Sequence, residues 1–156
     1  MKKHHYAMSV TWTGNKGEGT KGYRSYDRSH TIGGDGKPVI PGSSDPSFRG
    51  DAARYSPEDL LVASISSCHM LWFLHLSSDA GIVVTEYVDH AEGTMIETAD
   101  GGGRFEEVLL RPRISIEGDP GAAAVDAVHH QAHKLCFIAN SCNFLIRHEA
   151  EYVFNS

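Results

Sequence analysis

The chain has 156 residues, of which 40% are hydrophobic and 22% are charged, as in a soluble globular domain. The formal net charge of -6, without any basic stripe, argues against a nucleic-acid-binding surface. The N-terminus shows no apolar signal-peptide segment, and the longest strongly apolar stretch, residues 70–76, is too short to span a bilayer. We therefore expect one cytoplasmic domain, residues 1–156, with no membrane or nucleic-acid partner.

The N-terminal part of the chain reads as two strands joined by glycine-rich turns. Residues 6–12 alternate apolar and polar side chains, which predicts a half-buried strand, and residues 22–32 predict a weaker one. Residues 33–36 predict a turn. Residues 41–55 are rich in Gly, Ser, Asp and Pro and predict a long loop, and loops of that length in compact domains are usually functional.

A long helix is predicted next. Ser56 is suited to the N-cap, Pro57 to the first helical position, and Gly81 to a stop after the last turn. Between them, residues at intervals of three or four predict one buried face. The residues on this predicted face are Leu61, Ile65, Cys68, Trp72 and His75.

The second half of the chain predicts further strands around a second helix. Residues 82–97 and 104–117 read as two strands joined by a hairpin turn. A helix is predicted from Asp119 through Cys136, and residues 142–154 alternate as a final strand. Runs of strands interrupted by two helices predict an α+β fold and not a doubly wound one.

Two cysteines, Cys68 and Cys136, fall on the two predicted helices. A free cysteine is most often a buried small hydrophobe, and a reactive one needs a nearby cation that lowers its pKa. Glu58 and an arginine of the preceding loop, Arg49 or Arg54, are suited to form a carboxylate–guanidinium pair of that kind. The sequence therefore offers both a packing and a reactive interpretation of the two thiols.

The spacing of Glu58 and Cys68 limits how they can cooperate. Ten residues separate them, which is roughly 15 Å along a straight helix. Either the start of the helix is bent, or a second subunit brings its Glu and Arg to this cysteine. The second arrangement predicts a homodimer with the site at its interface.

The run from Ser56 to His69 resembles the first-cysteine motif of the OsmC/Ohr family (osmotically inducible protein C and organic hydroperoxide resistance protein). It opens with a Pro-Glu pair and places Cys68 ten residues after the Glu, while Cys136 matches the family's second cysteine. The resemblance covers nearly the whole chain. It implies an OsmC-like α+β fold with two antiparallel sheets and two main helices, the first long and central, in an intertwined homodimer.

The resemblance also implies a thiol peroxidase that reduces organic hydroperoxides, and hydrogen peroxide less well, with no metal or bound cofactor. Cys68 would be the peroxidatic thiolate that becomes a sulfenic acid, and Cys136 the resolving thiol that closes a disulfide with it. Glu58 would orient an arginine that lowers the pKa of Cys68. An external dithiol reductant, such as a lipoylated protein, would reopen the disulfide.

The chain departs from the family pattern at the arginine and after the second cysteine. Arg49 fits the arginine position of the OsmC branch best, and Arg54 is its neighbour. Arg24 or Arg28 would suit the Ohr branch. Phe137 follows Cys136 where family members often have a proline.

Other side chains near these motifs have simpler interpretations. Trp72, one helical turn beyond the first cysteine, and Ile65 are core residues first, and would also line an apolar pocket for an alkyl peroxide. The cluster of His129, His130 and His133 lacks the ligands of a zinc site and predicts a solvated helix face.

Two alternatives to the peroxidase stay open. One is a non-catalytic OsmC-like protein that binds a small apolar or electrophilic ligand in the same pocket. The other is a structural dimer whose cysteines are merely buried. Cys142, six residues past Cys136, is more consistent with packing on the core face of the last strand, and is also a second candidate for the resolving thiol.

Overall fold

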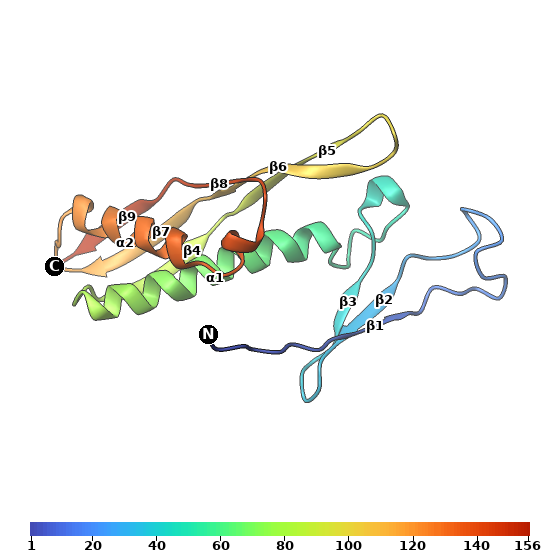
Figure 1. Ribbon diagram of the computed structural model, residues 1–156, viewed down its shortest axis with the longest axis horizontal. Coiled ribbons are helices and arrows are strands. Elements are labelled where there is room, and N and C mark those ends of the chain that lie inside the picture. The colour runs from blue at the N-terminus through green and yellow to red at the C-terminus, as the bar shows by residue number, and fades with distance from the viewer. The chain divides into compact units, whose positions relative to one another are not determined.

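The computed structural model describes all of residues 1–156, and the chain divides into two compact units, residues 1–60 and 61–156. The N-terminal unit holds a three-stranded antiparallel sheet in the order β1-β2-β3, drawn in blue to cyan in Figure 1. Its elements are β1 (Ser9–Trp12), β2 (His30–Gly33), β3 (Ile40–Gly42) and the short 3-10 helix η1 (Pro46–Phe48).

The first strand is shorter and more exposed than the alternation predicts. β1 covers four residues, and none of them is buried: Val10 is 67% exposed and Trp12 44%. No hydrophobic side chain of residues 1–60 is buried in the chain. The prediction of a half-buried strand is therefore wrong for the isolated chain, because its apolar side chains meet no core.

The predicted loop at residues 41–55 is confirmed over most of its length, although it contains part of β3 and the helix η1. The Asp45 carboxylate caps η1 by accepting the Ser47 N–H at 2.7 Å. Arg49 ends η1 with a left-handed φ of 63°. Gly50 is required there, since a Cβ would lie 1.6 Å from the Ser44 carbonyl oxygen.

The long helix α1 (Pro57–Asp79) begins and ends where local signals predict. The Ser56 hydroxyl accepts the Asp59 N–H at 3.1 Å, and the Asp59 carboxylate accepts the Ser56 N–H at 2.9 Å, which is a reciprocal capping box. Gly81 follows the last turn with a φ of 73°, a conformation that glycine adopts without steric cost. Both the N-cap and the stop signal are confirmed.

The buried face of α1 differs from the predicted one. Ile65, His69, Phe73 and Ser77 are buried at steps of four residues. The predicted members Leu61, Cys68 and Trp72 lie beside this face and are only partly buried, and His75 is exposed. The prediction was wrong because apolar residues surround this helix on every side, so periodicity alone did not select the face that meets the core.

The C-terminal unit contains six strands where the sequence predicted three. Each long strand is interrupted: at residues 90–91, at Arg111 and at residues 149–150. The resulting pieces form two three-stranded sheets, in the orders β4-β7-β9 and β5-β6-β8. The strands are β4 (Val84–Asp89), β5 (Glu92–Glu97), β6 (Gly103–Leu110), β7 (Pro112–Glu117), β8 (Leu145–His148) and β9 (Glu151–Asn155).

The second helix, α2 (Ala122–Leu135), connects β7 to the last two strands. Because this crossover returns the chain to the same end, β8 runs parallel to β6 and β9 parallel to β7. The α+β class with two main helices is confirmed. The chain forms three sheets, and two of them contain both parallel and antiparallel pairs. The prediction of two antiparallel sheets is wrong in this respect.

Two hydrophobic clusters build the core of the C-terminal unit. Phe73 of α1 packs with Ile114 and Ile116 of β7 and with Val125 and Ala132 of α2. The second cluster joins α1 to the other sheet, through Ile65, Val108, Leu110 and Ile146.

Helix α1 is also the one helix that is long and apolar enough to cross a membrane, which the sequence argument from a short apolar stretch did not foresee. Its buried side chains join both core clusters, as expected of a core helix in a globular unit.

Candidate active site

Two free thiols lie side by side in the C-terminal unit. Cys68 is half-buried in the middle of α1, and Cys136, just after the last turn of α2, is 1% exposed. The pKa of Cys136 is raised from 9.0 to about 11, first by burial and then by hydrogen bonding and charge from the adjacent Cys68 thiol. The structure thus brings together two cysteines that are far apart in the sequence.

The end of α2 fixes the position of Cys136. The Cys136 N–H donates to the Ala132 carbonyl at 2.9 Å, and its Sγ accepts the Ala139 N–H at 3.4 Å. Ala139 begins the short helix η2 (Ala139–Ser141). Cys136 has an extended conformation and ends the helix, whereas the sequence predicted it within the helix. The thiol is therefore held at a chain reversal, next to a backbone donor.

The third cysteine, Cys142, is held in a different way. Cys142 comes directly after η2 and before β8 begins. The prediction that placed it in the last strand is therefore wrong. Its thiol donates to the Ile138 carbonyl at 3.2 Å, and burial raises its pKa. Cys142 also packs against the cluster that contains Ile65. These contacts agree with a packing role.

Glu58 lies in the first turn of α1, where its negative charge is favoured by the helix dipole. One carboxylate oxygen, Oε2, is buried and has no hydrogen-bond partner. Buried carboxylate oxygens are normally paired, so this acceptor is available to a further donor. The predicted partner, Arg49, is exposed, and its guanidinium forms no ion pair or hydrogen bond, although its backbone N–H donates to the Pro46 carbonyl at 3.1 Å.

The other arginines considered from the sequence differ in how they are held. The Arg28 guanidinium donates to the carbonyls of Tyr23 and Tyr26, both at 2.7 Å, and stacks on both rings. Arg54 donates to the His30 carbonyl at 3.3 Å and lies 3.8 Å from the Asp51 carboxylate. Arg24 is exposed, like Arg49. Of these four arginines, only Arg24 and Arg49 have a guanidinium without a fixed partner in the chain.

An aromatic pair borders the two thiols. Trp72, four residues beyond Cys68 on α1, meets the ring of Phe137 edge to face, with centroids 5.5 Å apart and planes at 85°. Phe137 is 68% exposed although its neighbour Cys136 is buried. Ile65, which the sequence placed beside a substrate, is fully buried in the core and presents no surface to a ligand.

A stack of histidines is the feature that sequence reasoning missed. His69 of α1, His129 of α2 and His148 of β8 lie with ring centroids 5.3 to 5.6 Å apart. His69 Nε2 and His129 Nδ1 share a hydrogen bond of 3.0 Å, and Phe73 stacks on His129 at 4.1 Å. The predicted solvated face is wrong for His129, which is fully buried, whereas His130 is exposed.

Burial keeps these imidazoles neutral. The pKa of His129 is lowered from 6.5 to about 3 and that of His69 to about 4, first by desolvation and then by the charge of the neighbouring imidazoles. No group of three or more His, Cys, Asp or Glu side chains has a geometry that could hold a metal ion. A signal was present in the sequence, since His69 lies four residues from both Ile65 and Phe73 and so shares their face.

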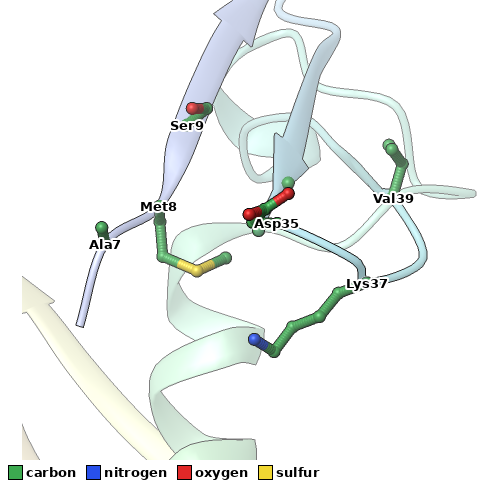
Figure 2. Close-up of a pocket in the computed structure, with 8 residues that line it drawn as sticks. Ala7, Met8, Ser9, Asp35, Lys37 and Val39 are labelled. Carbon is green, nitrogen blue, oxygen red and sulfur yellow. The ribbon is translucent and has the colours of Figure 1, made fainter.

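One surface hollow belongs entirely to the N-terminal unit. Figure 2 shows the Met8 side chain reaching toward the side of the hollow formed by Asp35 and Lys37. Gly34 is one of the residues that line the hollow, and the Cβ of any larger residue at this position would lie 3.3 Å from the Met8 sulfur. None of the lining residues is a cysteine, histidine or arginine: they are Ala7, Met8, Ser9, Gly33, Gly34, Asp35, Lys37 and Val39. The hollow therefore offers no thiol and no imidazole.

Comparison with known proteins covers the part of the chain that holds both thiols. The family model described as OsmC-like protein matches residues 50–150, which include both Cys68 and Cys136. An OsmC-like protein of unknown function from Vibrio cholerae is 32% identical over 95% of this chain and 99% of its own, with a TM-score of 0.86. No curated protein matches the sequence.

Two structures with functional descriptions share the fold. An organic hydroperoxide resistance protein from Elizabethkingia anophelis is 20% identical over 99% of this chain and 100% of its own, with a TM-score of 0.68. The organic hydroperoxide resistance protein OhrB of Bacillus subtilis is 18% identical over 95% of this chain and 98% of its own, with a TM-score of 0.63. At these identities the likeness concerns the fold alone.

Proposed function

Because the chain belongs to the OsmC-like protein family, we propose that it is a cysteine-based peroxidase that reduces organic hydroperoxides, and hydrogen peroxide less well, in defence against oxidative stress. The observation that carries the proposal is the contact between the free thiols of Cys68 and Cys136. Paired free thiols of this kind fit the reducing environment of the cytoplasm, where cysteine pairs serve redox chemistry more often than structure.

In the first step Cys68 is the nucleophile. It is the more accessible of the two thiols, and its thiolate attacks the distal oxygen of the hydroperoxide. The O–O bond breaks, an S–O bond forms, and the alkoxide leaves and takes up a proton. Cys68 becomes a sulfenic acid and the peroxide becomes an alcohol.

In the second step Cys136 resolves the sulfenic acid. Its raised pKa keeps this thiol protonated at neutral pH, so it does not compete for the peroxide. Its sulfur attacks the Cys68 sulfur, the S–O bond breaks and water leaves with the thiol proton. An external dithiol, such as a lipoylated protein, then reduces the disulfide by exchange and is itself oxidised to a disulfide.

The activating charge pair completes the proposed site. Glu58 would hold the guanidinium of Arg49, whose positive charge would attract the attacking sulfur of Cys68 and polarise the peroxide. Supporting this role, Glu58 has a buried oxygen without a donor, while Arg49 has no partner. In a single chain the pair is not formed, so a second copy is expected to bring the two residues together.

The exposed apolar surface supports a homodimer. Tyr6, Met8 and Val10 of the N-terminal unit are 84%, 57% and 67% exposed, and Leu71 of α1 is 62% exposed. Large apolar side chains left exposed in this way are typical of a protein interface. A second copy of the chain that covers these side chains would also place its active site at the interface.

Consumption of cumene hydroperoxide with dihydrolipoamide as reductant tests the proposal. The wild type is expected to consume the peroxide faster than the dithiol alone, and Cys68→Ser to abolish that excess. Cys142→Ser is the matched control and should retain the rate. A wild type no faster than free dithiol would reject the peroxidase and favour the non-catalytic ligand-binding alternative.

A further inference from the structure

A buried pair of histidines joins α1 to α2 directly beside the two thiols. His69 follows Cys68 on α1, and its Nε2 shares a hydrogen bond of 3.0 Å with Nδ1 of His129 on α2. We propose that the His69–His129 pair positions the thiols, because its hydrogen bond holds them in contact so that a disulfide can form. The pair acts in the second step of the proposed peroxidase reaction, on which this role depends.

The spacing along α2 links this hydrogen bond to the thiols. His129 and Cys136 are seven residues apart, which is two helical turns or about 10.5 Å, so they lie on the same side of the helix axis. Ala132, between them, is fully buried. The two ends of this stretch meet consecutive residues of α1, His69 and Cys68. Two contacts along one face fix both the direction of α2 and the face that it turns to α1, whereas a single contact leaves α2 free to pivot.

Apolar packing between the two helices sets no alignment of its own. Phe73 of α1 packs with Val125 and Ala132 of α2, and such packing is non-directional. The bond between His69 and His129 is the only side-chain hydrogen bond that joins the two helices. Because hydrogen bonds weaken steeply when donor and acceptor are misaligned, this bond favours one alignment of α2 over its neighbours.

The bond has no competitor inside the core. Both histidines are at most 1% exposed, and burial keeps both rings neutral. A neutral imidazole has one N–H and one bare nitrogen, so either ring can donate to the other. The second nitrogen of His129, Nε2, is buried without a partner, so Nδ1 makes the only hydrogen bond of this ring. A shift of α2 that breaks the bond would leave further buried nitrogens unpaired, which is costly.

In the proposed cycle the bond matters after the peroxide has reacted. Attack of Cys68 on the peroxide needs no second thiol, so it does not depend on where α2 lies. Closure of the disulfide does depend on it, since the Cys136 sulfur must reach the Cys68 sulfur before the S–O bond breaks and water leaves. While the thiols are apart, a second hydroperoxide can oxidise the sulfenic acid to a sulfinic acid and is itself reduced to an alcohol. Loss of the bond should therefore slow closure and favour overoxidation.

Single-turnover kinetics with cumene hydroperoxide separate the two steps. His129→Phe keeps a ring on Phe73 and removes the bond, so the Cys68 thiol should be lost at the wild-type rate while the disulfide closes about 3- to 10-fold more slowly. His69→Leu should behave in the same way, and the double variant should be no slower than either single variant. Equal slowing of both steps, or an unchanged rate of closure, would overturn the role.

Two matched variants distinguish the hydrogen bond from packing. His69→Gln places an amide near the position of Nε2 and should close the disulfide faster than His69→Leu. His148→Phe keeps a ring stacked on both histidines without touching their bond, and should close it at the wild-type rate. If Gln rescues nothing, or if His148→Phe is as slow as His129→Phe, packing alone is at work and the role is overturned. Circular dichroism shows which variants fold, and the two His69 variants decide if His129→Phe does not.

Equilibration with glutathione tests the positioning role without any peroxide. In a buffer of reduced and oxidised glutathione, the ratio of disulfide to dithiol gives the effective concentration of the Cys68–Cys136 pair, with Cys142→Ser as a common background. This concentration is expected to be about 3- to 10-fold lower with His129→Phe than without it. Equal values would overturn the positioning role even in an active peroxidase. The expected difference in a protein that consumes no peroxide would uphold the positioning of the thiols and reject the proposed function alone.

Discussion

Acid should destabilise this protein well above the pH at which its carboxylates titrate, because of the buried histidines. His129 and His69 have folded-state pKa values of about 3 and about 4, against 6.5 in the unfolded chain. Below pH 6.5 the unfolded chain therefore binds more protons than the folded one. The stability that depends on neutral imidazoles is fully present above that pH and is lost as the pH falls through 6.5 toward 4.

The size of the effect follows from the shifts. Below its unfolded pKa, each such group costs about 1.4 kcal/mol per pH unit. Between pH 8 and pH 5 this is roughly 2 kcal/mol for each histidine and about 4 kcal/mol for the two. No discount for solvent applies, since both side chains are at most 1% exposed. His148, whose pKa is also lowered by burial, adds to the same slope.

Urea unfolding at pH 8, 7, 6 and 5, at fixed salt and chain concentration, measures this slope. His129→Phe keeps an aromatic ring on Phe73 and is expected to remove about half of the pH dependence. His90→Gln changes an exposed histidine and should leave it intact. A wild-type free energy of unfolding that is the same at pH 8 and pH 5 would refute the reasoning.

Three further substitutions test other parts of the structure. Phe73→Ala opens a cavity between α1, α2 and β7 and should lower the free energy of unfolding by about 3–5 kcal/mol, measured in urea. Ser56→Ala removes one half of the capping box and should cost about 1 kcal/mol in the same assay, whereas a cost near zero would show that the cap contributes nothing. Arg49→Ala should lower kcat/KM for cumene hydroperoxide roughly 100-fold, with Arg54→Ala as the matched control, and a larger loss for Arg54→Ala would reassign the activating arginine.

The parts of the fold that depend on local chemistry were predictable from the sequence. Ser56, Pro57 and Gly81 set the ends of α1 through capping and backbone preferences that act within a few residues. The same holds for the hairpin between β5 and β6, whose turn includes Gly101 with a φ of 85°.

The errors arise where distant residues decide the structure. His129 is buried because His69, 60 residues away, supplies its hydrogen bond, and no local pattern contains that partner. The breaks in the long strands, such as the one at Arg111, appear only when the pieces join different sheets. The alternation of β1 likewise could not predict that Val10 is 67% exposed, because burial depends on which side chains pack against the strand.

The candidate site divides in the same way. The motif around Cys68 marked one thiol, but its contact with Cys136 required the packing of α1 against the end of α2. Phe137 was noticed only as a departure from the family pattern. Its edge-to-face contact with Trp72 joins two segments that are far apart in the sequence.

The central claim is that Cys68 and Cys136 form a redox pair, and single-turnover mass spectrometry tests it most directly. After one equivalent of cumene hydroperoxide, the wild type is expected to lose two thiols and about 2 Da, with peptide mapping showing a disulfide between Cys68 and Cys136. Cys136→Ser should instead gain oxygen on Cys68. If both thiols remain free and unmodified after minutes, or if the disulfide joins Cys68 to Cys142, the account of this site is contradicted.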